Sequence, residues 1–211
     1  MELYLIRHGT TDWNKERRFQ GRVDRELNKE GRELAIKLGN RIDSIPFDLI
    51  FSSPLIRAYE TACLIRGRRN IQIIRDASIQ ELSFGKMEGV PYTEWIKTDH
   101  PRKYFFTDPA KYLPPEGGET FQEACQRTKL FIQEKIEPLY QTNPDGRYMI
   151  VSHGALLASM ICYLENHGIE NFWGKGLKGN CEETVYSFDG KTWTKTLEEE
   201  TKKNPYEEGT K

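Results

Sequence analysis

The sequence lacks the features that would place the protein in a membrane or on a nucleic acid. Its longest uncharged apolar stretch runs only from Ala155 to Leu164, which is too short to span a bilayer. The 31 Lys and Arg residues are balanced by 32 Asp and Glu residues, so no overall basic field exists to hold nucleic acid or an anionic membrane. No basic segment precedes the N-terminal apolar run, and a signal peptide is therefore not expected.

Cysteine is scarce, and its spacing excludes two kinds of site. The four cysteines are far apart and form no CxxC pair, which argues against zinc ribbons and thioredoxin-type redox motifs. No HExxH motif or paired Asp cluster occurs either, so we expect no metal and no cofactor. These absences predict a reduced, cytoplasmic protein without a nucleic-acid or membrane partner. We expect it to be a monomer or homodimer, although the sequence does not reveal which.

Short apolar runs alternate along the 211 residues with segments of helical periodicity. The runs predict strands over residues 2–6, 47–51, 71–74 and 148–151 and a hairpin over 184–196. The predicted helices cover residues 28–42, 55–65 after Ser53-Pro54, 120–140 behind a Thr120–Glu123 capping box, and 155–164. This order predicts an α/β fold of three layers, α/β/α, with a mostly parallel central sheet and one antiparallel edge.

One segment interrupts this alternation. Residues 84–118 show no clean periodicity. They contain five prolines and, after Phe84, six further aromatic residues, which are Tyr92, Trp95, Tyr104, Phe105, Phe106 and Tyr112. We expect a small cap of short helices and irregular chain, inserted into a single domain over residues 1–197. Residues 198–211 are rich in charge and are expected to form a C-terminal tail.

Two of the predicted strands end in the same way. The first is followed by Arg7-His8-Gly9 and the strand at 148–151 by Ser152-His153-Gly154, while Arg57 lies in the first turn of a helix that follows another strand. If the strands are parallel, these side chains meet at one edge of the sheet, where open α/β sheets bind ligands. Two imidazoles and two guanidiniums at a helix N-terminus suit a phosphate dianion.

A longer series of motifs accompanies these residues. The chain reads Arg7-His8-Gly9-Thr10-Thr11-x-Trp13-Asn14, Phe19-Gln20-Gly21, Ser52-Ser53-Pro54-Leu55-x-Arg57-Ala58, Glu81-x-x-x-Gly85-x-x-Glu88-Gly89, Gly118-Glu119-Thr120 and Val151-Ser152-His153-Gly154. In this order the motifs resemble the histidine phosphatase superfamily, also called the phosphoglycerate mutase-like family. The resemblance covers residues 1–190, nearly the whole chain.

The resemblance implies a role for each matching residue. His8 would be the nucleophile that forms a phosphohistidine, kept neutral by Arg7, Arg57 and a protonated His153. His153 would also donate to a phosphoryl oxygen, and Glu81 would protonate the leaving group and then deprotonate water. The pKa of Glu81 would be raised by the phosphate dianion of the substrate. Glu88 is expected to be structural, and the phosphate would also contact Asn14, Gln20, Gly21 and the backbone of Gly154.

These roles predict a metal-independent phosphomonoester phosphatase that acts on small phosphorylated metabolites. The Arg-Phe-Gln-Gly stretch at 18–21 and the short cap are similar to the broad-specificity and α-ribazole phosphatase branches. A phosphoglycerate mutase is the first alternative. At three positions where such mutases carry Tyr, Lys and Asn, this chain has Phe84, Tyr92 and Ala155, but the basic pair Arg102-Lys103 keeps that alternative open. An inactive binding protein on the same fold is the second alternative.

The cap is expected to set substrate preference. Its aromatic residues would suit an apolar or ring-bearing leaving group, and Arg102 and Lys103 would favour acidic substrates.

Overall fold

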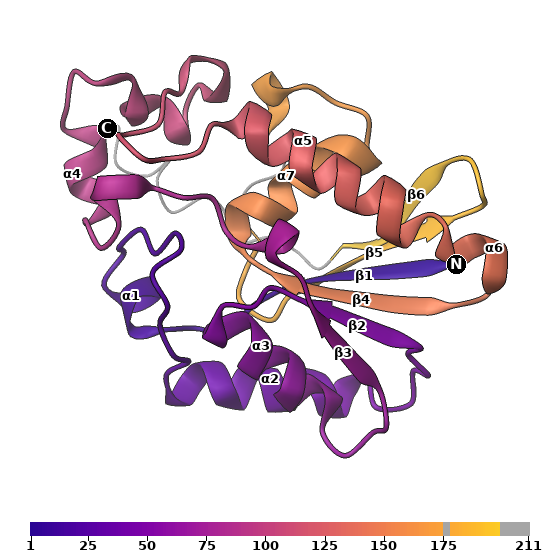
Figure 1. Ribbon diagram of the computed structural model, residues 1–211. Coiled ribbons are helices and arrows are strands. Elements are labelled where there is room, and N and C mark those ends of the chain that lie inside the picture. The colour runs from indigo at the N-terminus through magenta and orange to yellow at the C-terminus, as the bar shows by residue number, and fades with distance from the viewer. Residues whose placement is uncertain (175–177, 199–211) are drawn as a thin grey trace.

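The computed structural model describes residues 1–174 and 178–198 and is built on one six-stranded sheet (Figure 1). The strand order is β3-β2-β4-β1-β5-β6. The bounds are β1 Glu2–Arg7, β2 Leu49–Ser52, β3 Gln72–Arg75, β4 Arg147–Ser152, β5 Glu183–Phe188 and β6 Trp193–Glu198. Strands β1 to β4 are parallel, whereas β5 runs antiparallel to β1 and forms a hairpin with β6 at the edge. The predicted fold class is confirmed.

Strands β1 and β4 lie side by side near the centre of the sheet, and their register fixes where a ligand crevice opens. Arg7 pairs with Ser152, so His8 and His153 follow neighbouring strands at the same edge. From β1 the chain continues to β2 on one side of this pair, and from β4 it continues to β5 on the other side. Such a reversal opens a crevice at the carboxyl ends of the strands.

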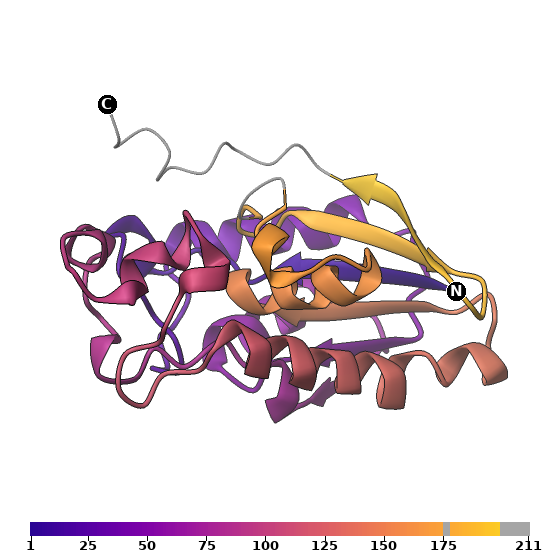
Figure 2. The same cartoon turned by 90° about the horizontal axis from the view of Figure 1, so that it is seen from above.

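Helices cover both faces of the sheet (Figures 1 and 2). Strand residues alternate between the two cores, since Leu3 and Leu5 pack on one side while Tyr4 and Ile6 pack on the other. Burial on both faces explains why the strands are continuous apolar runs in the sequence. The first core lies under α5 (Phe121–Phe131) and α7 (Gly154–Leu164), and the second under α2 (Lys29–Arg41) and α3 (Ile56–Arg66).

The start of α3 differs from the prediction. Pro54 does not occupy the first helical position, because Leu55 is the N-cap residue and the helix begins at Ile56. A leucine side chain cannot accept a hydrogen bond, and the acceptor comes instead from Asp24, whose Oδ1 receives the Ile56 N–H at 2.7 Å. A capping partner so distant along the chain leaves no local signal.

The predicted long helix over 120–140 is interrupted. Its capping box is present, with Thr120 and Glu123 bonded reciprocally, but after α5 the backbone widens into a π-helical turn over Ile132–Ile136. A separate helix, α6, then covers Leu139–Thr142. Pro138 stands between them, and because proline has no N–H the ladder of backbone hydrogen bonds is broken there.

The cap lies beyond the carboxyl ends of the parallel strands (Figure 1). Aromatic side chains form its core, since Trp95, Phe105 and Tyr112 are almost fully buried and their rings contact one another. Its turns are η2 (Gly85–Met87), α4 (Tyr92–Ile96), η3 (Pro101–Phe105) and η4 (Pro109–Lys111). The other short elements are α1 (Asp12–Lys15), η1 (Ala77–Ile79) and η6 (Ile169–Asn171).

Two further findings bear on the domain prediction. Among the described residues, no helix has the length and apolar character needed to cross a membrane. Strand β6 ends at Glu198, and residues 199–211 of the predicted tail lie outside the described residues. The division into a domain over 1–197 and a tail over 198–211 therefore stays a prediction.

Candidate active site

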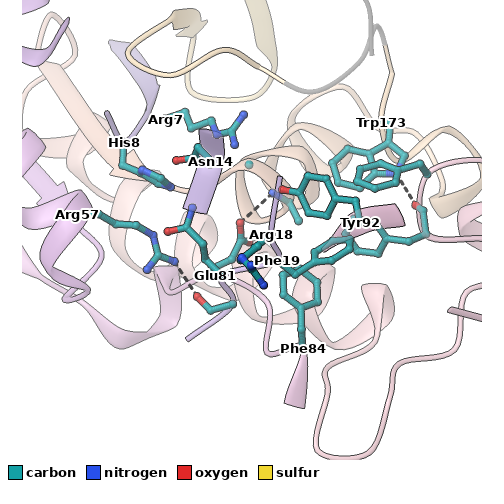
Figure 3. Close-up of a pocket in the computed structure, with 16 residues that line it drawn as sticks. Arg7, His8, Asn14, Arg18, Phe19, Arg57, Glu81, Phe84, Tyr92 and Trp173 are labelled. Carbon is teal, nitrogen blue, oxygen red and sulfur yellow. Dashed lines mark hydrogen bonds between the residues drawn. The ribbon is translucent and has the colours of Figure 1, made fainter. Parts of the chain in front are cut away.

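The carboxyl ends of β1 and β4 open into a pocket under the cap (Figure 3). Eight of the nine predicted site residues line it, whereas His153 is buried behind the lining. The eight are Arg7, His8, Asn14, Gln20, Gly21, Arg57, Glu81 and Gly154. The fold thus brings together residues that are widely separated in the sequence.

His8 follows the last residue of β1 and is held in one orientation. Its side chain is 3% exposed, and its Nδ1 lies 2.6 Å from the carbonyl oxygen of Gly9. A carbonyl oxygen can only accept a hydrogen bond, so Nδ1 carries the proton and the lone pair of the neutral ring is on Nε2. The ring therefore offers Nε2 as its nucleophilic atom.

The environment keeps the His8 ring neutral. Its pKa lies well below the ordinary value of 6.5, and burial is the largest cause, followed by the positive charges of Arg57 and Arg7. A neutral imidazole is the form that can attack an electrophile. The two arginines lower the pKa of His8 as expected, but burial lowers it more.

His153 lies beside His8 at the start of α7. It is the N-cap residue of α7, is fully buried, and lies with its ring centroid 5.1 Å from that of His8. Burial and then Arg57 lower its pKa well below 6.5. Burial therefore disfavours the protonated form that was expected for His153, and its charge when a phosphate dianion is bound stays a prediction. Its Nε2 lies 2.7 Å from Ser53 Oγ, and its Nδ1 has no hydrogen-bond partner among residues 1–174 and 178–198.

The two arginines are fixed by backbone carbonyl groups. Arg57 donates from Nη1 to Val23 O at 3.0 Å and from Nη2 to Gly21 O at 2.7 Å, and Arg7 donates from Nη1 to Lys178 O at 2.6 Å. Burial lowers the pKa of Arg57 to about 10, which leaves it charged at neutral pH. The Nε atoms of both arginines are buried without a partner in the described chain. Such donors suit an anion with several acceptor oxygens.

Asn14 and Gln20 add neutral polar groups to this side of the pocket. Asn14 Oδ1 accepts hydrogen bonds from the backbone N–H and the hydroxyl of Thr11, at 3.0 and 3.1 Å, so its amide NH₂ remains as a donor. Gln20 is 7% exposed and precedes Gly21, which has a φ of +53°. A Cβ at Gly21 would lie 2.1 Å from a carboxylate oxygen of Glu88, so this turn requires glycine.

Glu88 holds the same turn from outside the pocket. Its Oε1 accepts from the backbone N–H groups of Arg22 and Phe84 at 2.9 and 3.1 Å, and its Oε2 accepts from Val23 N–H at 2.8 Å. Every one of these contacts is to main chain. The expectation that Glu88 is structural agrees with this geometry.

Glu81 is anchored at the N-terminus of α7. Its Oε1 accepts from the backbone N–H groups of Leu82 at 2.9 Å and Leu156 at 3.1 Å, and its Oε2 from Ala155 N–H at 3.3 Å. These bonds and the neighbouring arginines favour the carboxylate, yet burial outweighs them and raises the pKa. The rise that was expected from a bound phosphate is thus already produced by burial. Gly154 and Ala155 both line the pocket at this end of α7, and Glu81 occupies the Ala155 N–H.

The opposite wall of the pocket is aromatic. Phe84, Tyr92, Phe105 and Phe106 line it, and Trp95 and Tyr112, two of the other cap aromatics, are buried behind them instead. Three of the six predicted cap aromatics, Tyr92, Phe105 and Phe106, therefore line the pocket, and their contact with a leaving group stays a prediction. Phe19 and Trp173 complete the wall, and Trp173 is tied to the cap because its Nε1 donates to Phe105 O at 2.6 Å.

The basic residue in this wall is Arg18 and not the predicted pair. Arg102 and Lys103 do not line the pocket, whereas Phe105 at the end of η3 and Phe106 after it do. The Lys103 ammonium lies 5.4 Å from the centroid of the Tyr104 ring. Arg18 instead donates from Nη1 to Gly89 O at 2.8 Å and from Nε to Glu16 at 2.5 Å.

Three of these lining residues, Arg18, Phe19 and Trp173, were missed as site residues. One signal for Arg18 and Phe19 was present, since they belong to the same Arg-Phe-Gln-Gly stretch as Gln20 and Gly21. Trp173 lies far from every motif, and only the tertiary structure places it.

The pocket also bears on metal binding. Within residues 1–174 and 178–198, no group of three or more His, Cys, Asp or Glu side chains is arranged to hold a metal ion. The positive charge that faces the pocket comes from Arg7, Arg57 and Arg18.

Comparison with known proteins connects this site to a family. Residues 3–201 match the model of the histidine phosphatase superfamily (branch 1). A glucosyl-3-phosphoglycerate phosphatase of Mycobacterium tuberculosis is 30% identical, over 88% of this chain and 84% of its own. A 2,3-bisphosphoglycerate-dependent phosphoglycerate mutase of Cytophaga hutchinsonii is 32% identical, over 77% and 76% of the two chains.

The fold leads to the same group of proteins. The solved structure of Bacillus stearothermophilus YhfR superposes with a TM-score of 0.85 and 31% identity, and covers 95% of this chain and 98% of its own. The family match extends over nearly the whole described chain, and five of the six predicted motifs contribute residues to one pocket. The chain therefore belongs to the histidine phosphatase superfamily, branch 1.

Proposed function

We propose that the protein hydrolyses small phosphomonoesters through a phosphohistidine formed on His8. The observation that carries this proposal is the state of the His8 ring. Its Nδ1–H is bound to Gly9 O and its pKa is lowered, so a neutral Nε2 is presented in a pocket that also contains Arg7 and Arg57. A nucleophile beside two fixed guanidiniums suits attack on a phosphoryl group.

In the first step, His8 Nε2 attacks phosphorus and the bond to the ester oxygen breaks. Arg7 and Arg57 stabilise the charge on the non-bridging oxygens, and Asn14, Gln20, Gly21 and the Gly154 N–H assist. The departing alkoxide takes a proton from Glu81, whose raised pKa favours the acid form. The His153 ring lies beside the His8 ring, and its donation to a phosphoryl oxygen stays a prediction.

In the second step, a water molecule attacks the phosphohistidine. The Glu81 carboxylate, now without its proton, accepts one from that water, and His8 leaves as a neutral imidazole together with inorganic phosphate. One carboxyl group thus serves as acid and then as base.

The pocket favours a phosphatase over a mutase. The positions at which the resemblance distinguishes the two activities are Phe84, Tyr92 and Ala155, and all three line the pocket. They carry side chains that provide no ammonium or amide to hold a phosphoglycerate for return of its phosphoryl group. The inactive-protein alternative is disfavoured because His8, Glu81 and the two arginines meet in one pocket.

The substrate class follows from the other wall. Aromatic rings accept the carbon skeleton of the leaving group, and Arg18 is placed to contact an acidic group on it. The names of two relatives include phosphoglycerate, which carries a carboxylate. We therefore propose small, carboxylate-bearing phosphomonoesters as substrates, turned over without metal by a cytoplasmic monomer or homodimer.

A screen of phosphate release tests the proposal. Phosphoserine, 3-phosphoglycerate, glycerol phosphate and p-nitrophenyl phosphate are assayed in EDTA, with and without 2,3-bisphosphoglycerate. We expect phosphate release in EDTA, an acid-labile phosphoenzyme, and no isomerisation of 3-phosphoglycerate. Stimulated isomerisation would favour the mutase, and a requirement for a divalent ion would contradict the arginine-based site.

A further inference from the structure

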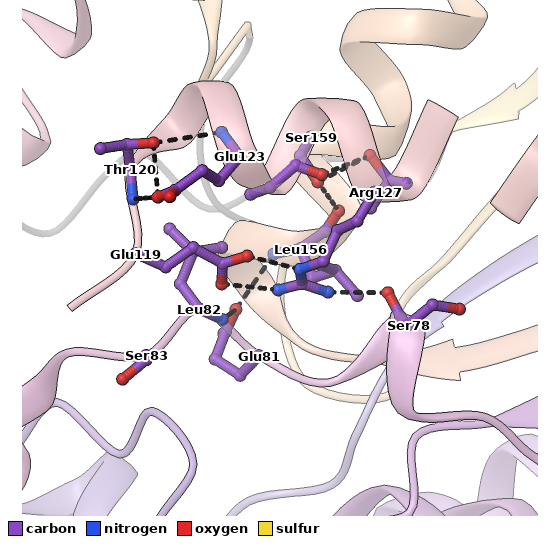
Figure 4. Close-up of polar contacts among 12 residues, drawn as sticks. Ser78, Glu81, Leu82, Ser83, Glu119, Thr120, Glu123, Arg127, Leu156 and Ser159 are labelled. Atoms are coloured by element: carbon purple, nitrogen blue, oxygen red, sulfur yellow. Dashed lines mark hydrogen bonds and ion pairs between the residues drawn. The ribbon is translucent and has the colours of Figure 1, made fainter. Parts of the chain in front are cut away.

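An ion pair outside the pocket holds the segment that carries Glu81 (Figure 4). Residues 80–83 belong to no helix or strand, so backbone ladders do not fix the position of Glu81. Glu119 precedes the N-cap of α5, and Arg127 lies within α5. Neither residue lines the pocket.

The two side chains form a two-point contact. Arg127 Nε lies 2.6 Å from Glu119 Oε1, and Arg127 Nη2 lies 2.9 Å from Glu119 Oε2. Both side chains are mostly buried, at 19% and 11% exposure, so solvent screens the pair less than it screens the ion pairs on the surface.

From this pair, contacts reach the Glu81 segment on both sides. Arg127 Nη1 donates to Ser78 O at 2.7 Å, three residues before Glu81. The Glu119 backbone N–H donates to Ser83 O at 2.8 Å, two residues after it. Glu119 Oε2 also accepts from Arg22 at 3.2 Å, and Arg22 Nε approaches Glu81 O itself at 3.4 Å. Hydrogen bonds thus fix the Glu81 segment to α5 and to the residue before its N-cap.

These contacts also determine where the Glu81 carboxyl meets α7. That carboxyl is bound to backbone N–H groups at the start of α7, including that of Leu156, and α7 is joined to α5 by a buried hydrogen bond from Ser159 to Thr128 at 3.2 Å. A shift of the segment relative to α5 would therefore move the carboxyl away from the N-terminus of α7.

We propose that Glu119 and Arg127 are positioning residues for proton transfer by Glu81. This inference rests on the proposed function, because it assumes that Glu81 is the acid. Small misplacements of a catalytic group cost up to about 100-fold in rate. The loss should appear only where protonation of the leaving group matters.

The experiment compares two substrates in Glu119→Gln, which keeps the shape of the side chain but removes its charge. We expect kcat/KM to fall about tenfold for glycerol phosphate and by about twofold or less for p-nitrophenyl phosphate, whose leaving group scarcely needs a proton. Arg127→Lys, which retains the charge but cannot make the fork, should show the same selective loss. The matched control is Glu2→Gln, which breaks the Arg147–Glu2 pair at the opposite end of β1 and should leave the ratio of the two substrates unchanged.

A double-mutant cycle separates this inference from the proposed function. In the Glu81→Gln background, Glu119→Gln should cause no further loss with glycerol phosphate, because the group it positions is gone. Equal losses with both substrates, or a full additional loss in the double variant, would overturn the positioning role. If Glu81→Gln itself fails to distinguish the two substrates, Glu81 is not the acid, and the proposed function fails at that step.

Discussion

The two halves of the pocket are built by different means. The half that we propose binds phosphate, called the phosphate side below, contains His8, Arg7 and Arg57. Its functional atoms are held by hydrogen bonds to main chain, such as those of His8 with Gly9 O and of Arg57 with Gly21 O. On the leaving-group side, aromatic rings are held mainly by contact with one another, as with Phe19 and Trp95, whose centroids are 3.9 Å apart. Directional bonds fix individual atoms, whereas ring packing fixes only a shape.

This difference suits two separate tasks of the pocket, which are the chemical step at phosphorus and the choice of substrate. Charge development at phosphorus requires donors that are in place before the reaction, which backbone anchoring provides. Recognition of a carbon skeleton requires an apolar surface whose outline can change without disturbing those donors. Glu81 has a part in both halves of this proposal, because its carboxyl is anchored to α7 and it also lines the pocket.

The largest effect should come from the phosphate side, at the nucleophile. We expect His8→Ala to lower phosphate release to background while the fold is kept, because the covalent step needs its Nε2. Steady-state phosphate release and circular dichroism would be measured on the same samples. His167→Ala, at a histidine outside the pocket, is the matched control and should retain activity. Substantial turnover by His8→Ala would place the nucleophile elsewhere.

The next effect should depend on the leaving group. Glu81→Gln should slow phosphorylation of His8 by about 10²–10⁴-fold with alkyl phosphates and much less with p-nitrophenyl phosphate. Dephosphorylation should slow with both, because water still needs a base, so phosphoenzyme should accumulate with the activated ester. Rapid-quench kinetics separate the two steps. An equal loss of the phosphorylation step with both esters would point to another proton donor.

Burial of the phosphate side should also make stability depend on pH. The pKa values of His8 and His153 are lowered well below 6.5 in the folded protein, so below that pH the unfolded chain binds protons that the folded protein does not. The free energy of unfolding should therefore fall as pH falls. The slope that each histidine contributes should approach about 1.4 kcal/mol per pH unit. The raised pKa of Glu81 acts in the opposite direction.

Urea unfolding of the wild type and of His8→Ala, in buffers without phosphate, isolates the contribution of one histidine. The variant should lose less stability than the wild type between about pH 7 and pH 5. Parallel curves for the two proteins would mean that the pKa of His8 is ordinary in the folded state.

The same contrast explains which features the sequence could predict. His8, His153 and Arg57 follow apolar runs, and parallel strands bring such positions to one edge by geometry alone. Glu81 follows no periodic pattern and was found only through the family resemblance. The helix cap supplied by Asp24 and the pocket position of Trp173 depend on tertiary contacts between distant segments. Local patterns therefore predicted the phosphate side well and the cap poorly.

The smallest effect should come from the leaving-group side, at Arg18. We expect Arg18→Ala to lower kcat/KM for phosphoserine by about three- to tenfold, because a charge-assisted contact is worth roughly 1–2 kcal/mol and is weakened by solvent; the Arg18 side chain is 37% exposed. Activity on p-nitrophenyl phosphate should change by about twofold or less, since that ester has no carboxylate to hold. Arg102→Ala and Lys103→Ala serve as matched controls and should leave both substrates unaffected, because neither residue lines the pocket. A selective loss in the controls but not in Arg18→Ala would mean that the cap rearranges around the substrate, and that the aromatic wall is less fixed than its packing indicates.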